Sequence, residues 1–450
     1  MPRNVIRSLA ACATAAALAL TTAPAAQAAP AVSAQATADS FYTYTGSTPL
    51  ASYTPGAVLN TRTFRYQLAG LSTPVQVTQI LYRSTDAQGR PSANVTSVLR
   101  SPYGDGRRAV SYQSAYDSLN PEHGPSRAIA GNAAPGGGVL AQAETALMLR
   151  YVLAGYTLVM PDTEGQQANF AAGPEYGTNT LDSLRAAAKV PGSGVDSGTR
   201  FGLIGYSGGA IATHWAAALA PRYAPDINKK LVGFSEGGLL VKPAHNLKYV
   251  SGSKMWSGVI PMAVIGIARS YGIDFTPYLN DYGVEVMKKL EHESILAGWS
   301  HALSSGGISW EEMAKPAYKD PNSIPEFVTA VNKVSLGQAP TPTVPGYIVQ
   351  GDAGWLEGTS GNPPGIGTGD GVMVSGDVRA LARQYCATGN TAIKYRQYDG
   401  LSHVGAVPPW DLATLGWLDD RFDGKAAPSS CGSIPPGNSL APERVVSPAS

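Results

Sequence analysis

The fold is decided by the stretch Phe201-Gly202-Leu203-Ile204-Gly205-Tyr206-Ser207-Gly208-Gly209-Ala210-Ile211-Ala212. An apolar strand pattern at 201–204 runs into a Gly-x-Ser-x-Gly motif, and a helical pattern follows. The glycines of this motif permit a sharp turn between strand and helix, which exposes the serine hydroxyl. We therefore predict that Ser207 is a nucleophile. The helix N-terminus behind it would leave the amide of Gly208 free to donate to an oxyanion.

Strand and helix patterns alternate on both sides of this turn. Two stretches of alternating polarity, 75–82 and 93–99, flank a turn signal and predict an antiparallel hairpin. Further strands are predicted at 108–113, 156–160, 231–234, 347–350 and 393–398, and helices at 140–154, 179–190 and 210–219. This alternation predicts an α/β fold with a mostly parallel, doubly wound sheet that begins with the hairpin.

The domain organisation follows from where this alternation holds and where it breaks. It breaks over 237–339, where apolar helical stretches occur without a clear buried strand, and we predict an inserted helical cap there. The cap divides the core into a first part at 64–236 and a second part at 340–431. A Tyr-, Pro- and Thr-rich segment at 30–63 is expected to form a surface arm. A Pro- and Ser-rich tail at 432–450 is expected to be loose.

The N-terminus has the pattern of a secretion signal. Arg3 and Arg7 precede an apolar stretch, 9–20, that is too short for a mature membrane anchor, and Ala26-Gln27-Ala28 has the small-x-small pattern of a cleavage site. We predict a signal peptide at 1–29 and secretion of the mature protein. An uncleaved anchor helix is the alternative.

The number of cysteines agrees with export of the protein. Cleavage would remove Cys12 and leave Cys386 and Cys431, an even number for an oxidising compartment. We expect these two residues to form a disulfide, with two free buried thiols as the alternative.

Composition and charge exclude some functions. The sequence has 14% charged residues and a formal net charge of +1, and no run of like charge stands out. No nucleic-acid partner is therefore expected. No group of residues has the spacing of metal ligands, and neither a metal nor another cofactor is expected. The oligomeric state is left open.

A serine nucleophile needs a base, and histidine is the usual one near neutral pH. In a fold of this type the order along the chain is serine, acid, histidine, with the histidine on a loop after the last core strand. His403 fits both the order and the loop. His214 is expected to pack near the turn, and His292 and His301 fall in the predicted cap.

The acid of the triad should follow the strand at 347–350. Asp352 comes directly after this strand. Asp370 comes after a Gly/Pro-rich segment, 354–369, that looks like an inserted loop, and Asp377 is a weaker third candidate. Order alone does not separate the first two.

Several stretches together carry a family resemblance: Ile80–Asp86, Ser111–Gln113, Pro161–Gly165, Leu181–Ala186 and the Gly205–Gly209 turn. Through them the chain resembles the secretory lipase family, whose best-known members are yeast lipase A-like enzymes, in its actinobacterial branch. The family belongs to the α/β-hydrolase superfamily. The resemblance therefore implies an α/β-hydrolase fold for most of the mature chain.

The resemblance also assigns site residues. In the family a catalytic Asp is followed by apolar residues and a helix that ends in Cys-Ala-x-Gly. Asp370 and the Cys386–Gly389 stretch match this pattern, which favours Asp370 over Asp352, although the loop before Asp370 departs from the family. The family further implies that the amide of Asp117 is the second oxyanion donor beside Gly208. A turn-capping side chain is the alternative for Asp117.

The implied activity is secreted carboxylic-ester hydrolysis through an acyl-enzyme, on acylglycerols or other lipid-like esters. An acyltransferase that uses an alcohol acceptor and a non-catalytic binding protein on the same scaffold are the alternatives. The apolar stretch 259–265 either lines an acyl pocket or is an ordinary buried helix. Transient contact with a lipid interface through the cap is expected.

Overall fold

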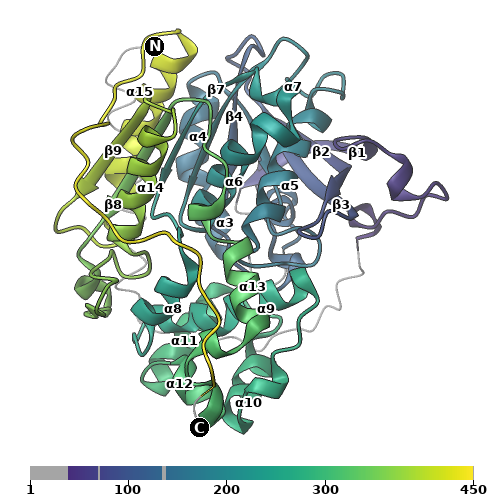
Figure 1. Ribbon diagram of the computed structural model, residues 1–450. Helices are drawn as coiled ribbons and strands as arrows, with labels where there is room; N and C mark the ends of the chain where they lie inside the picture. The colour runs from purple at the N-terminus through teal and green to yellow at the C-terminus, as the bar shows by residue number, and fades with distance from the viewer. Residues whose placement is uncertain (1–38, 69–70, 134–137, 449–450) are drawn as a thin grey trace.

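The fold is built on a nine-stranded sheet in the order β1-β2-β3-β5-β4-β6-β7-β8-β9 (Figure 1). The computed structural model describes residues 39–68, 71–133 and 138–448. The predicted signal peptide at 1–29 lies outside the described residues. Within these three ranges, no helix has both the length and the apolar character needed to cross a membrane.

The sheet is antiparallel at its N-terminal edge and parallel elsewhere. Its strands are β1 Val58–Leu68, β2 Leu71–Thr85, β3 Pro91–Arg100, β4 Arg108–Gln113, β5 Thr157–Pro161, β6 Arg200–Tyr206, β7 Leu231–Gly237, β8 Gly346–Gly351 and β9 Ile393–Tyr398. The pairs β1–β2, β2–β3 and β3–β5 are antiparallel, and the pairs from β5 through β9 are parallel. The predicted fold class is confirmed.

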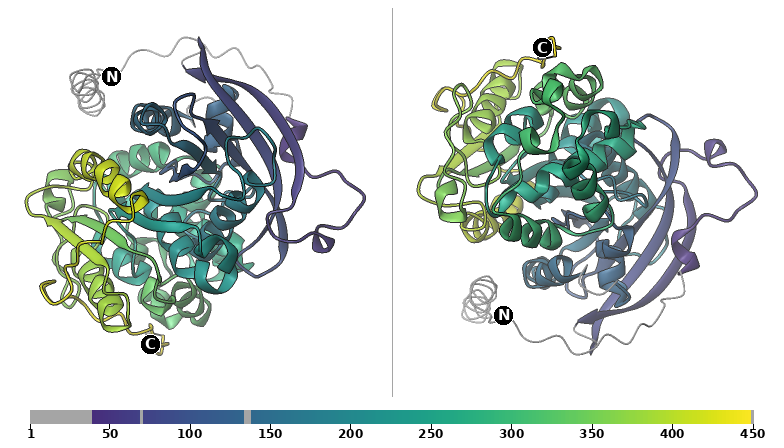
Figure 2. Two further views of the ribbon diagram at one scale, coloured as in Figure 1. Left: turned by 90° about the horizontal axis from the view of Figure 1, so that it is seen from above. Right: turned by 90° about the horizontal axis from the view of Figure 1, so that it is seen from below.

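The N-terminal edge contains one strand more than the sequence predicted. The expected hairpin is present as β2 and β3, but β1 pairs with β2 along its other side. The prediction of a surface arm over 30–63 is therefore wrong from Val58 onward. Thr, Val and Phe side chains favour a strand there, and the long β2 offers a free edge for backbone hydrogen bonds. Both views in Figure 2 show β1 and β2 bending along one edge of the molecule.

Helices cover both faces of the sheet. The α-helices of the described ranges are α2 Pro125–Ala130, α3 Val139–Ala143, α4 Thr145–Leu153, α5 Gly173–Ala187, α6 Gly208–Tyr223, α7 Pro225–Asn228, α8 Pro243–Val250, α9 Val259–Tyr271, α10 Asp281–Leu290, α11 Ile295–Ser305, α12 Trp310–Met313, α13 Pro325–Lys333, α14 Ser375–Ala387 and α15 Val407–Phe422. Leu181 of α5, Ala212 of α6 and Leu381 of α14 share one buried apolar cluster with the sheet. Tyr151 of α4 and Trp410 of α15 belong to another.

The chain between β7 and β8 forms the helices α8 to α13, which gather beyond one end of the sheet (Figure 1). They contribute most of an apolar cluster, with Met262, Trp310 and Ile324 among its most buried members. This cluster also takes in Leu119, Phe170 and Val372 from outside the region predicted as a cap, which faces the carboxyl ends of the parallel strands.

The C-terminal tail follows a defined path as far as Pro448, whereas a loose segment was expected at 432–450. The predicted disulfide joins Cys386 and Cys431, with a Cα–Cα distance of 5.6 Å. From there the tail crosses α14 and runs down to the cap, as the yellow chain in Figure 1 shows. Glu443 forms an ion pair with Lys242 at 2.7 Å. Polar side chains and free backbone groups of the tail find partners on both the core and the cap, so its composition does not leave it loose.

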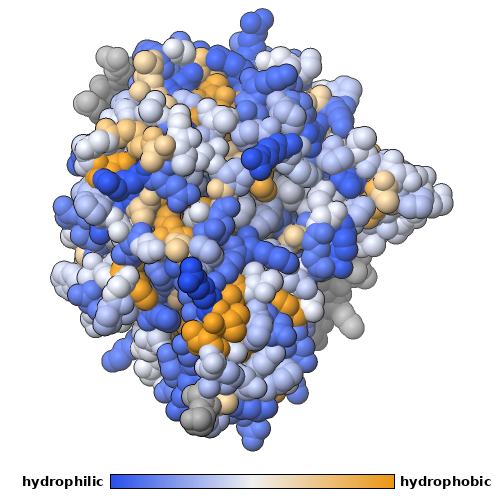
Figure 3. Space-filling view, in the orientation of Figure 1, coloured by the Kyte–Doolittle hydropathy of each residue, from blue (hydrophilic) through white to orange (hydrophobic). Residues whose placement is uncertain are grey.

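The face of the molecule in Figure 3 is mostly polar. On the face seen in Figure 3, apolar side chains form small separate patches among hydrophilic ones. Among the large apolar side chains that are exposed, Trp355 has 68% and Leu356 has 51% of its surface accessible. Both lie on η9, the 3₁₀ helix Gly354–Glu357. This short helix belongs to the segment that the sequence identified as an insertion.

Candidate active site

Ser207 lies on the turn between β6 and α6 with strained backbone angles, φ 56° and ψ −120°. Such angles are uncommon for a residue with a side chain and persist only where the surroundings enforce them. A Cβ atom on Gly205 would lie 2.2 Å from the Gly209 carbonyl oxygen, and one on Gly209 would lie 2.1 Å from the Gln113 carbonyl oxygen. Both glycines of the motif are therefore required by close backbone approach.

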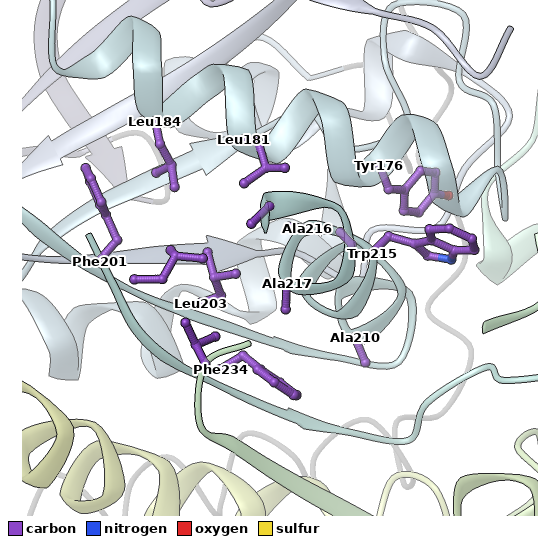
Figure 4. Packing of buried hydrophobic residues seen from close by; sticks show 14 of the residues in the cluster. Tyr176, Leu181, Leu184, Phe201, Leu203, Ala210, Trp215, Ala216, Ala217 and Phe234 are labelled. Atoms are coloured by element: carbon purple, nitrogen blue, oxygen red, sulfur yellow. The ribbon is translucent and has the colours of Figure 1, made fainter. Parts of the chain in front are cut away.

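The two elements that form this turn are held by dense packing. Figure 4 shows Leu181 and Leu184 of α5 and small side chains of α6, such as Ala216 and Ala217, packed near Phe201 on the sheet. Alanines let α6 lie close to the strands. The position of Ser207 is thereby determined by elements that bury nearly all of their apolar surface.

Hydrogen bonds connect Ser207 to His403 and His403 to Asp370. Nε2 of His403 lies 2.8 Å from Oγ of Ser207. Nδ1 of the same ring lies 2.9 Å from Oδ2 of Asp370. His403 and Asp370 are buried. The structure thus brings together the three residues that the sequence analysis selected for catalysis.

Of the three acids considered, Asp370 is the one that contacts the histidine. Asp352 instead accepts a hydrogen bond from the backbone N–H of Gly400 at 2.9 Å, at the turn that follows β9. Asp377 lies in α14 and pairs with Nδ1 of His245 at 2.9 Å. The family pattern, and not nearness to β8 along the sequence, selected the residue that the structure places beside His403.

The Asp370 carboxylate is held rigidly. Its Oδ1 accepts hydrogen bonds from the backbone N–H groups of Val372 at 3.1 Å and Met373 at 2.7 Å. Its Oδ2 accepts one from Nε2 of Gln350 at 2.8 Å. Burial acts to lower the pKa of His403, but the charge and hydrogen bond of Asp370 outweigh it, with smaller contributions from Glu357 and Asp117. The pKa of His403 is therefore raised above its usual value.

The loop after β4 carries Asp117 to the other side of Ser207. Asp117 has a positive φ of 35°. A Cβ atom on Gly208 would lie 1.7 Å from Oδ1 of Asp117, so this close approach requires the glycine. Gly208 is the first residue of α6, where N–H groups have no intrahelical partner. Asp117 and Gly208 line the same cavity as Ser207.

Two glutamates hold the ends of this loop. The carboxylate of Glu144 accepts the N–H of Ala115 at 3.0 Å, and that of Glu164 accepts the N–H of Ser118 at 3.2 Å. Burial, followed by repulsion from Glu144, raises the pKa of Asp117 to about 7. Burial also raises the pKa of Glu144 to about 7. Glu164 stands in a stretch that carried the resemblance, whereas no sequence signal marked Glu144.

A narrow cavity of about 90 Å³ leads from Ser207 into the cap. One side of α9 lines it with Val259, Ile260, Ala263, Val264 and Ile267. The helical period turns the intervening Met262 and Ile265 into the core of the cap, where both are buried. One face of this helix therefore lines the cavity, and the other is buried as in an ordinary helix.

Aromatic side chains that the sequence analysis did not select surround the His403 ring. The rings of Trp256 and Tyr206 have their centroids 5.1 Å and 5.2 Å from it. The Tyr206 hydroxyl donates to the backbone carbonyl of His403 at 2.7 Å. Tyr206 belongs to the Ser207 motif, but Trp256 lies in the cap, and no spacing rule connects it to the histidine.

The remaining predicted positions lie away from this site. His214 is buried in the core with Nδ1 2.5 Å from Glu236 and Nε2 2.6 Å from the Tyr385 hydroxyl. His292 and His301 lie in the cap, on α11 or just before it. In the part of the chain that the structure describes, no three His, Cys, Asp or Glu side chains are grouped so that they could hold a metal ion.

Known proteins resemble this chain over most of its length. A profile of the family described as secretory lipase matches residues 132–355. Lipase 2 of Candida albicans is 30% identical over 397 residues, with 84% of this chain and 79% of the relative covered. A Mycobacterium tuberculosis protein named "Probable inactive lipase MT1628" is 30% identical over 378 residues, with 82% of this chain and 79% of the relative covered.

Solved structures share the fold. Candida antarctica lipase A in its closed state superposes with a TM-score of 0.74 at 22% identity, over 89% of this chain and 90% of that one. The rice cell wall degrading esterase LipA from Xanthomonas oryzae gives a TM-score of 0.57 at 12% identity, over 82% of this chain and 99% of that one. At these identities the likeness concerns the arrangement of the sheet and its helices.

Proposed function

The chain belongs to the secretory lipase family, and we propose that it cleaves esters with Ser207 as nucleophile, His403 as base and Asp370 as the acid that orients the base. It is a carboxylic-ester hydrolase. The observation that supports the assignment of roles most strongly is the unbroken series of hydrogen bonds from Ser207 through both ring nitrogens of His403 to Asp370.

The proposed reaction has two halves. His403 takes the proton from Ser207 as the serine oxygen attacks the acyl carbonyl, and Asp370 stabilises the resulting imidazolium. The amides of Gly208 and Asp117 donate to the oxyanion of the tetrahedral intermediate. His403 then protonates the departing alcohol, and a water molecule deacylates the enzyme with His403 again as base. Loss of one oxyanion donor of this kind costs on the order of 10²–10³ in turnover.

The cavity supports a lipid-like acyl group. Apolar side chains of α9 follow it from Val259 to Ile267. Eight residue steps at 1.5 Å each make this row roughly 12 Å long. We propose that the acyl chain extends along this row, which suits a chain of medium length. We therefore propose acylglycerols and other esters of such acids as the substrates.

Secretion and contact with lipid are parts of the same proposal. The disulfide between Cys386 and Cys431 suits an oxidising compartment. Leu303 of the cap, with 62% of its surface accessible, offers an apolar contact to a lipid surface. Trp355 and Leu356 on η9 offer two more outside the cap. Transient contact with a lipid interface therefore need not involve the cap alone.

A Ser207→Ala variant tests the proposal. We expect it to lose p-nitrophenyl butyrate hydrolysis and labelling by a fluorophosphonate, while Ser304→Ala, an exposed serine in the cap, keeps both. Since one relative bears a name that includes "inactive", a non-catalytic protein is the competing outcome. Unlabelled parent enzyme without measurable turnover of any ester would establish that outcome and exclude our proposal.

A further inference from the structure

We infer that Glu357 is a positioning residue for His403, because one carboxylate holds both the loop that carries the histidine and the indole that packs against its ring. Oε1 of Glu357 accepts the backbone N–H of Val404, the residue after His403, at 2.8 Å. Oε2 accepts Nε1–H of Trp256 at 2.7 Å. The inference rests on the proposed role of His403 as the base.

The indole of Trp256 restrains the imidazole directly. The two rings have centroids 5.1 Å apart and an interplanar angle of 76°, which is an edge-to-face contact. Trp256 is buried and begins the short 3₁₀ helix Trp256–Gly258 in the cap. Its N–H requires an acceptor in this position, and Glu357 supplies it. Without this acceptor, the indole would lose the bond that sets its orientation against His403.

The backbone around Glu357 is itself fastened to the site. The N–H of Gly354 donates to the carbonyl of Gly369 at 2.9 Å, which closes the base of the inserted segment 354–369 beside Asp370. The Thr359 hydroxyl donates to the carbonyl of Gly371 at 2.6 Å. A Cβ atom on Gly371 would lie 3.0 Å from Oε2 of Glu357, so the carboxylate fits closely over this turn. Glu357 is thus placed by the same segment that delivers Asp370.

The charge of Glu357 also acts on His403. Acidic groups of three elements act electrostatically on this ring: Asp370 before α14, Asp117 after β4 and Glu357 on η9. Tyr206 and Trp256, which also pack on the ring, carry no charge. Each carboxylate favours the imidazolium form, which His403 must adopt after it has taken the serine proton. Removal of the Glu357 charge therefore acts against protonation of His403.

The decisive variants are Glu357→Gln and Trp256→Phe. A glutamine keeps an acceptor for Val404 but brings an N–H₂ group against the indole N–H and removes the charge. A phenylalanine keeps a ring against His403 and leaves the charge of Glu357 in place. Glu326→Gln is the matched control, since Glu326 also accepts a single side-chain hydrogen bond, from Tyr278, but lies on the outer side of the cap.

We expect kcat for p-nitrophenyl butyrate to fall on the order of tenfold in both Glu357→Gln and Trp256→Phe, because a loosened base spends less time in reacting geometry. The acid limb of kcat/KM should move to lower pH by on the order of half a unit in Glu357→Gln alone. The control should change neither quantity. Thermal melts of each variant report whether the fold is intact.

An acid limb at the parental pH in a folded Glu357→Gln variant overturns the inference, as does parental kcat in Trp256→Phe. An equal shift in Glu326→Gln also overturns it, since the effect would then belong to overall charge. These outcomes are separate from the fate of the proposed function, because Ser207→Ala tests that function without any change near Glu357.

Discussion

Replacement of Asp370 by Asn should separate activity from stability. Oδ1 of Asp370 accepts two backbone N–H groups, and we expect the asparagine carbonyl oxygen to keep both bonds. Its Nδ2 then faces His403 and Gln350. Oε1 of Gln350 has no hydrogen-bond partner among the described residues, so a rotated Gln350 amide can accept one proton of Nδ2. The other proton is directed at Nδ1 of His403.

This arrangement stabilises the wrong tautomer of His403. With Nδ1 accepting, the ring carries its proton on Nε2, 2.8 Å from Ser207, and cannot take the serine proton. Loss of the correct tautomer in a triad of this kind lowers kcat by about 10⁴-fold, or roughly 5.5 kcal/mol of barrier at 1.36 kcal/mol per tenfold change. Because both backbone bonds to Oδ1 are kept and only the Nε2 bonds of Gln350 are rearranged, Tm should change by only a few degrees.

The assay compares kcat for p-nitrophenyl butyrate in Asp370→Asn, Asp352→Asn and the parent, with thermal melts of all three. Asp352 is the matched control because it also follows β8 but accepts the N–H of Gly400 away from the histidine. We expect it to keep most of the parental activity. An inactive Asp352→Asn beside an active Asp370→Asn would refute the reasoning, and so would an Asp370→Asn variant whose activity loss matches a loss of folded protein.

Three further outcomes follow from features described above. Ala263→Phe places a large side chain in the row that lines the cavity, so turnover of p-nitrophenyl octanoate should fall at least tenfold while that of the acetate changes little. Burial raises the pKa of Glu144 from 4.5 to about 7, so the folded protein binds this proton more tightly than the unfolded chain and loses stability as pH rises through this window. Glu144→Gln removes that loss, and its Tm relative to the parent should rise between pH 4.5 and 7.5; a constant difference would contradict the shift. Replacement of Cys386 and Cys431 by alanine opens a link across a sequence separation of 45 and should cost about 4 kcal/mol of unfolding free energy in chemical denaturation.

The parts of the site that the sequence could predict are those with local rules. The turn at Ser207 follows from glycines at fixed positions between a strand and a helix, and His403 follows from chain order after the last strand. Asp370 could not be separated from Asp352 by order. The N–H of Gly354 bonds to the carbonyl of Gly369, which closes the inserted segment on itself and returns the chain to the end of β8. Both acids are therefore near the strand in space, and only one faces the histidine.

The contacts that sequence reasoning missed join segments far apart in the chain. Glu357 meets Trp256 across 101 positions, and neither residue belongs to a motif. Glu144 reaches the loop of Asp117 from the junction between α3 and α4, where a lone glutamate resembles any solvated helix residue. Such contacts depend on tertiary packing, which leaves no regular spacing in the sequence.

The C-terminal tail binds the inserted helices and so affects how an ester can enter the cavity at Ser207. A domain inserted at one point of a fold is joined to it by two adjacent connecting segments. Such a domain can rotate about these segments as about a hinge. Here a third connection exists, because the tail leaves the core at Cys431 and is bound to the inserted helices by the ion pair of Glu443 with Lys242 and by the bond from the Val446 N–H to the Asn322 carbonyl. A rotation of the inserted helices about the two connecting segments would therefore have to break these contacts of the tail. An ester that enters without breaking them needs side chains or single loops to move.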